Sequence, residues 1–120
     1  MRFALALLLA AAPTSADRWS GLLIDSRCYA SEERNVNPFD ASPYVDRDKD
    51  WEIRFCAPTP KTKHFAIVES DWSVLQFDSA GNAKAAELVL KTGKKKYLPV
   101  TVKGTLSKDK IKVDSVSVSR

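Results

Sequence analysis

The chain has 120 residues, of which 44% are hydrophobic and 28% charged, and its formal net charge at neutral pH is +4. With two cysteines, one histidine and four glycines, it contains neither paired C-x-x-C motifs for zinc nor a Walker or dinucleotide glycine pattern. No serine lies in a G-x-S-x-G elbow, and no apolar run reaches the roughly 18 residues of a membrane helix.

Residues 1–16 have the pattern of a cleavable signal peptide. Arg2 supplies a positive charge, residues 3–12 form an apolar run, and Pro13 precedes three small residues before the expected cut. Ten residues of helix rise only about 15 Å, roughly half of a hydrocarbon core. We therefore expect a secreted or periplasmic bacterial protein whose mature part, residues 17–120, is a single domain without a membrane span.

Charge is divided unevenly along the mature part. Residues 17–60 hold six Lys or Arg against nine Asp or Glu, whereas residues 61–120 hold twelve against six. A basic half can attract anionic partners, but lysines also keep strand edges from pairing with other chains, and we favour this second interpretation. We expect no nucleic-acid partner for an exported protein.

Cys28 and Cys56 form an even pair in a chain predicted to reach an oxidising compartment, so we expect a disulfide. Closing a loop of about 29 residues stabilises a fold by roughly 3.5 kcal/mol in the chain-entropy model. A metal site of the two cysteines with His64 is the alternative. It lacks the close cysteine spacing of zinc sites, and we expect neither a metal nor a cofactor.

The first part of the mature chain changes character at about residue 26. Residues 19–25 are apolar and predict a strand. Residues 26–63, called the excursion below, contain four prolines and many charges with little periodicity, and predict a long loop with a short helical turn near residues 50–55. A loop of this length in a compact domain needs something to pin it, and the cysteine bridge would do so.

The rest of the chain has clear periodic patterns. It predicts strands at residues 64–69, 72–78, 97–106 and 111–118, and one short helix at residues 83–91. In the last strand, Ile111 and Val113 have the opposite parity to Val116 and Val118. A β-bulge near residues 114–115 would restore one buried face and bend the strand.

Two short motifs carry a resemblance to a family. The segment WSG at residues 19–21, followed by Asp25 and Cys28, resembles the W-x-G…D-x-x-C opening of a family of small exported bacterial proteins of unknown function. The segments VTVKGTL at residues 100–106 and IKVDSV at residues 111–116 resemble the ending of the same family. The resemblance implies an OB-like fold and no particular activity. We therefore expect a mainly β domain with one short helix, built as a five-stranded OB-like Greek-key barrel, with a small sandwich or half-open roll as the alternative.

The candidate functional residues are an aromatic side chain and a basic cluster. Trp51 lies in the charged excursion, and Lys94, Lys95 and Lys96 are consecutive in a predicted loop. OB-like domains often bind ligands through aromatic and basic side chains, so we take these four residues as candidate ligand or partner contacts.

The function expected from these features is that of a non-enzymatic exported binding or accessory module. Its partner would be an anionic or envelope-associated ligand, or another protein. The alternative is a small periplasmic hydrolase or inhibitor-type protein that uses the 26–63 excursion. We identify no catalytic residues from the sequence.

Overall fold

The structure is a computed structural model that describes residues 17–35 and 42–119, so the predicted signal peptide lies outside the described residues. The strands are β1 (Asp17–Asp25), β2 (Phe65–Val68), β3 (Val74–Phe77), β4 (Pro99–Ser107) and β5 (Lys110–Val118). The helices are α2 (Ser26–Asn35), α3 (Ser42–Phe55) and α4 (Ser79–Thr92). The prediction of a mainly β chain with one short helix is therefore wrong, because the described residues form an α/β mixture with three helices.

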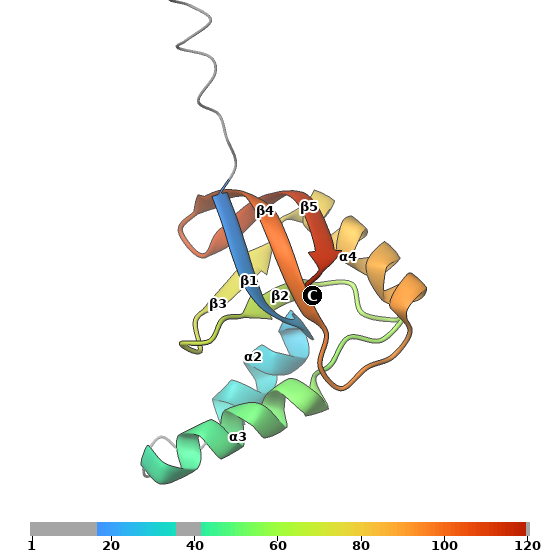
Figure 1. The fold of residues 1–120 in the computed structure, drawn as a ribbon. Helices are drawn as coiled ribbons and strands as arrows, with labels where there is room; N and C mark the ends of the chain where they lie inside the picture. The colour runs from blue at the N-terminus through green and yellow to red at the C-terminus, as the bar shows by residue number, and fades with distance from the viewer. Residues whose placement is uncertain (1–16, 36–41, 120) are drawn as a thin grey trace, which may run out of the picture.

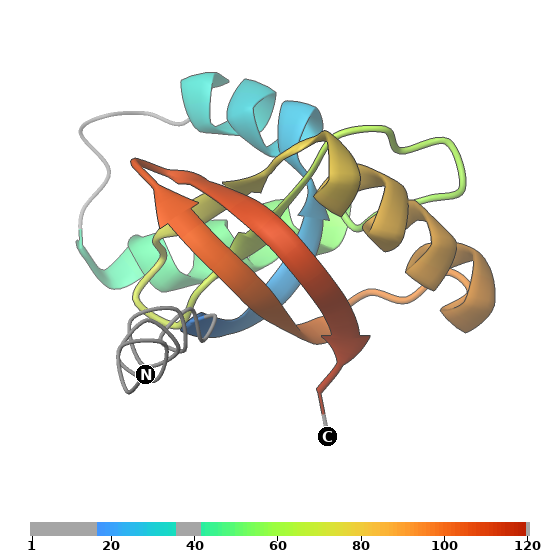
Figure 2. The same ribbon diagram turned by 90° about the horizontal axis from the view of Figure 1, so that it is seen from above.

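The five strands form one mixed sheet that closes into a ring in the order β1-β2-β3-β5-β4, with β4 pairing back to β1. The contact between β3 and β5 is parallel, and the other four strand pairs are antiparallel. Figure 1 shows α2 and α3 beyond one end of this sheet, whereas α4 lies along its side. The same arrangement is seen from above in Figure 2, where β4 and β5 cross in front of β1.

The predicted bulge in the last strand is confirmed. The pairing of β4 with β5 shifts between Lys103, which faces Ser115, and Gly104, which faces Val113. Asp114 is therefore the extra residue of β5. This shift lets Val116 pack against the same core as the residues before the bulge.

The interior of the closed sheet is apolar and is covered by α4. Ala85 and Val89 of α4 are buried against it, at the helical spacing i, i+4. The helix begins after Asp78, whose carboxylate accepts a hydrogen bond from the backbone N–H of Gly81. The sheet core consists of Leu23, Phe65, Ile67, Leu75, Phe77, Ala85, Val89, Leu98, Val100, Val102, Ile111 and Val113.

The excursion forms two helices where the sequence predicts a long loop with a short helical turn. Asp25, the last residue of β1, starts α2 because its Oδ1 accepts the backbone N–H groups of Arg27 and Cys28, at 3.1 and 3.0 Å. The second helix, α3, has Pro43 in its first turn, a position where proline removes no helical hydrogen bond. Of the four prolines, Pro43 therefore lies at a helix start, Pro58 and Pro60 lie after α3, and Pro38 lies outside the described residues.

The predicted disulfide is present and joins the two helical segments to each other. Cys28 of α2 bonds to Cys56, directly after α3, and their Cα atoms are 5.5 Å apart. The bridge lies in a second apolar cluster between the helices and the sheet, formed by Ile24, Tyr29, Ile53, Cys56, Ala66 and Val68. This smaller cluster holds the excursion against the outer side of β1 and β2.

The two ends of the excursion meet at the sheet. The backbone N–H of Ser26 donates to the carbonyl of His64 at 2.9 Å, and that of Asp25 donates to the carbonyl of Cys56 at 2.9 Å. The second carboxylate oxygen of Asp25 accepts a hydrogen bond from the hydroxyl of Thr62 at 3.1 Å. Asp25 therefore contacts both the start and the end of the segment.

Candidate functional site

One strip of α3 exposes a pair of aromatic side chains. Trp51 and Phe55 are one helical turn apart, and their rings stack with centroids 4.8 Å apart and an interplanar angle of 10°. Trp51 is 46% exposed and Phe55 58% exposed. The opposite strip of the helix, with Glu52 and Ile53, is buried. Stacking hides the facing sides of the two rings, and their remaining exposed parts present an apolar surface to solvent.

A second segment, the loop between α4 and β4, reaches the same helix. The hydroxyl of Tyr97 donates a hydrogen bond of 2.7 Å to Oδ1 of Asp50, and Nε of Arg54 donates one of 3.0 Å to Oδ2. The bond from Tyr97, followed by that from Arg54, lowers the pKa of Asp50 below its ordinary value. The bond to Asp50 in turn raises the pKa of Tyr97. One carboxylate thus holds the loop against the exposed strip of α3.

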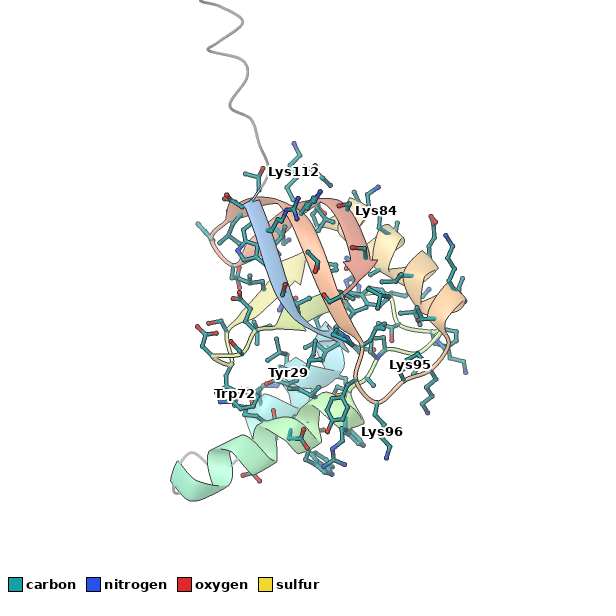
Figure 3. The ribbon with its side chains drawn as sticks, in the orientation of Figure 1. Tyr29, Trp72, Lys84, Lys95, Lys96 and Lys112 are labelled. Atoms are coloured by element: carbon teal, nitrogen blue, oxygen red, sulfur yellow. A yellow bond between two sulfur atoms is a disulfide. The ribbon has the colours of Figure 1, made fainter. Side chains whose placement is uncertain are left out.

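This contact joins the two segments that carry the candidate residues from the sequence. Asp50 directly precedes Trp51, and Tyr97 directly follows Lys96. Lys94, Lys95 and Lys96 are exposed. In Figure 3, Lys95 and Lys96 lie on the loop beside the end of α3, whereas Lys84 and Lys112 lie at the far end of the molecule. We call the combined surface the aromatic-basic patch, formed by Trp51, Arg54, Phe55, Lys94, Lys95, Lys96 and Tyr97.

Three residues of the aromatic-basic patch are not predicted from the sequence. Phe55 follows Trp51 at the i, i+4 spacing of a helix, a signal that could have identified it had the helix been recognised. Arg54 shares the i, i+4 relation with Asp50. Tyr97 adjoins the lysine cluster, but no sequence pattern shows that it bonds to a residue 47 positions away.

The buried strip of α3 carries ionisable groups that fix the helix against α2. Glu52 is only 2% exposed and lies against Glu33 of α2, whose Oε1 accepts a hydrogen bond from the ammonium group of Lys49. Two ionised carboxylates are both acceptors, so they bond to each other only when one keeps its proton. Burial, followed by the contact with Glu33, raises the pKa of Glu52 to about 8.

The same interface contains Tyr29, whose ring lies under Lys49, with Nζ 5.8 Å from the ring centroid. Tyr29 is 2% exposed, and burial raises the pKa of its hydroxyl. Burial keeps Glu52 away from solvent, so this carboxyl pair is suited to orienting α3 rather than to meeting a substrate.

The alternative of a metal site at the cysteines is excluded by their bond to each other, which leaves no thiolate to act as a ligand. Within residues 17–35 and 42–119, no three His, Cys, Asp or Glu side chains gather so that they could hold a metal ion. In the same residues, no helix is both long and apolar enough to cross a membrane.

Comparisons of the chain with models of protein families, with curated proteins and with solved structures give no match.

Proposed function

We propose that this chain is an exported, non-enzymatic binding module that uses the aromatic-basic patch to hold an anionic polymer of the cell envelope, such as an acidic glycan. The proposal rests on the hydrogen bond between Tyr97 and Asp50. This bond joins the loop that contains residues 94–96 to the helix that exposes the Trp51–Phe55 stack. Flat aromatic rings provide stacking surfaces, and neighbouring cations attract anionic groups.

The architecture proposed with this function is an OB-like Greek-key barrel. Three features support it: antiparallel pairing of β1, β2 and β3 in succession, a helix between β3 and β4, and the parallel contact of β3 with β5. The closed ring of strands is the expected frame for such a barrel. The family resemblance and the assignment to small exported bacterial proteins, periplasmic or secreted, belong to the same proposal. The disulfide is consistent with an extracytoplasmic location.

The alternative proposal, a hydrolase or inhibitor-type protein that works through residues 26–63, has less support. A carboxyl group with a raised pKa is a common general acid, and Glu52 has that property. However, its 2% exposure favours a structural role for the carboxyl pair. The exposed face of the same helix, in contrast, presents groups suited to binding.

The binding proposal is tested with the mature chain, residues 17–120, and an acidic polysaccharide such as alginate, with dextran as the neutral polymer. We expect alginate to bind at low salt, to dissociate as the salt concentration rises, and dextran to bind far more weakly. Trp51→Ala should weaken alginate binding about tenfold, an energy of ~1.4 kcal/mol, while loss of its stack on Phe55 lowers the free energy of unfolding by about 1 kcal/mol and leaves the chain folded.

The matched control uses lysines outside the aromatic-basic patch. The double variant Lys95→Gln and Lys96→Gln should lose affinity and salt dependence, whereas Lys84→Gln with Lys112→Gln removes the same charge at the far end of the molecule (Figure 3). Equal losses in the two double variants would mean attraction to overall charge rather than a site. Unchanged alginate binding after Trp51→Ala would show that the Trp51–Phe55 stack does not contact the polymer.

A further inference from the structure

A second surface, separate from the aromatic-basic patch, has the properties of a small-molecule site. A pocket of about 470 Å³ opens where β1, α3 and the turn between β2 and β3 meet. This volume lies in the range of roughly 300–1,000 Å³ that is usual for small-molecule sites. The apolar lining residues are Leu22, Ile53, Val68, Trp72 and Pro99.

The pocket follows from unequal strand lengths. β1 pairs with β4 over residues 17–22, but it pairs with β2 only from Leu22, because β2 ends at Val68. Beyond that point the chain turns, and the backbone N–H of Glu69 donates to the carbonyl of Ser73 at 2.8 Å. The space between the first half of β1 and this turn is therefore not filled by a strand, and Ile53 of α3 lies on its other side.

Trp72 is held against the pocket by an unusual backbone conformation. Its φ angle is 71°, in the left-handed region that bulky residues rarely adopt. Its N–H donates to the carbonyl of Glu69 at 2.9 Å, which closes the turn. The side chain is half-buried, packs against the second apolar cluster and lines the pocket. Figure 3 shows Trp72 at the end of the sheet that faces α2 and α3.

The charge of the pocket indicates the class of ligand. Among the described residues that line it, Glu69 is the one charged residue, and the other polar ones are serines. A carboxylate beside an indole ring is a combination that attracts ammonium groups, by ion pairing and by cation–π contact. We propose that this pocket binds a small organic cation: an apolar, preferably aromatic body in the apolar lining, with an ammonium group near Glu69 and Trp72.

The test compares three probes of similar size: 2-phenylethylamine, which is an ammonium ion at pH 7, the neutral 2-phenylethanol and the anionic phenylacetate. Each is titrated into the ¹⁵N-labelled mature chain, and amide chemical shifts are followed. We expect saturable shifts at residues 20–22, 68–72 and 119, with the ammonium probe bound about fivefold more tightly than the alcohol, as one partly exposed ion pair allows. The anion should bind most weakly.

Substitutions test whether Glu69 and Trp72 cause the preference for the ammonium probe. Glu69→Gln should remove most of the difference between the ammonium probe and the alcohol, leaving only the cation–π contribution of Trp72, while the alcohol's affinity stays unchanged. Trp72→Ala should weaken the binding of all three probes. Glu87→Gln, which makes the same substitution on the exposed side of α4, should weaken the binding of none. Equal affinity of ammonium and alcohol in the native chain would overturn the proposal and indicate a surface for an apolar segment. Saturable shifts centred elsewhere, or none, would overturn it as well.

Discussion

The closed sheet and the helical excursion are held together by different forces. The core of the sheet contains twelve buried residues, all of them apolar, drawn from the five strands, α4 and the loop before β4. The cluster under α2 and α3 contains six, including the disulfide-bonded Cys56 and the phenol of Tyr29, and the carboxyl of Glu52 is buried beside it. The sheet therefore depends on removing apolar surface from water, whereas the excursion adds to a smaller apolar cluster a disulfide and a buried carboxyl whose pKa is raised.

This difference indicates how conditions should act on each part. Apolar burial changes little with redox potential or pH. A disulfide is lost in reductant, and a raised carboxyl pKa makes stability depend on proton concentration. The experiments below test whether the sheet and the excursion lose stability independently or as one unit.

The largest effect is expected from the sheet core. Phe65→Ala removes a side chain that is 1% exposed and should lower the free energy of unfolding by about 3–5 kcal/mol, through lost burial and a cavity. Phe55→Ala, on the exposed strip of α3, should change it by less than about 1 kcal/mol. Urea denaturation followed by circular dichroism measures both. Similar losses in the two variants would contradict the assignment of the core to the sheet.

An intermediate effect is expected from the disulfide. Replacing Cys28 and Cys56 together by Ser should cost about 3 kcal/mol, and the loss should be concentrated in the excursion. Hydrogen exchange is the informative measurement. Amides of α2 and α3 should exchange much faster, while those of β1, β4 and β5 keep most of their protection. Uniform loss of protection would show that the two regions unfold as one unit.

A pH-dependent effect is expected from the buried carboxyl of Glu52. Its pKa is raised from 4.5 to about 8 by folding, so the folded chain binds the proton more tightly than the unfolded chain. This contribution to stability is complete below pH 4.5 and is lost as the pH rises through 8. Urea midpoints should therefore fall between pH 5 and pH 9. The neighbouring Glu33, whose pKa is lowered, acts in the opposite sense, and its contribution is lost in acid.

Glu52→Gln keeps the shape of the protonated acid and should remove much of the fall in stability toward pH 9. Glu87→Gln, an exposed control, should retain the fall seen in the native chain. A fall that persists unchanged in Glu52→Gln would assign the pH dependence to another group.

The parts of the fold that the sequence predicts are those with local, periodic signals. Runs of apolar and β-branched residues locate all five strands, alternation supports β4, and a parity change in β5 locates the bulge at Asp114. The excursion was predicted poorly because its helices carry charges around most of their surface, and a buried Glu52 does not resemble a core residue. Prolines usually indicate loops, but Pro43 occupies the first turn of α3, where it is compatible with a helix.

The candidate site was predictable only in pieces. Trp51 and the lysine cluster are noticeable in the sequence because of their residue types. Their proximity depends on the bond between Tyr97 and Asp50, which joins residues 47 positions apart and has no local signal. The pocket beside Trp72 was not predicted, since it results from the early end of β2 rather than from any motif.

The hydrogen bonds around Asp25 have a consequence for how such chains vary. Because Ser26 bonds to His64 and Asp25 bonds to Cys56 and Thr62, the whole excursion leaves and re-enters the sheet at nearly one point. A segment closed at its base can be lengthened, shortened or exchanged at little cost in loop-closure entropy, without moving β1 or β2. We therefore expect changes of length within the excursion that spare its base, the disulfide and the packed residues to leave the register of β1 and β2 unchanged.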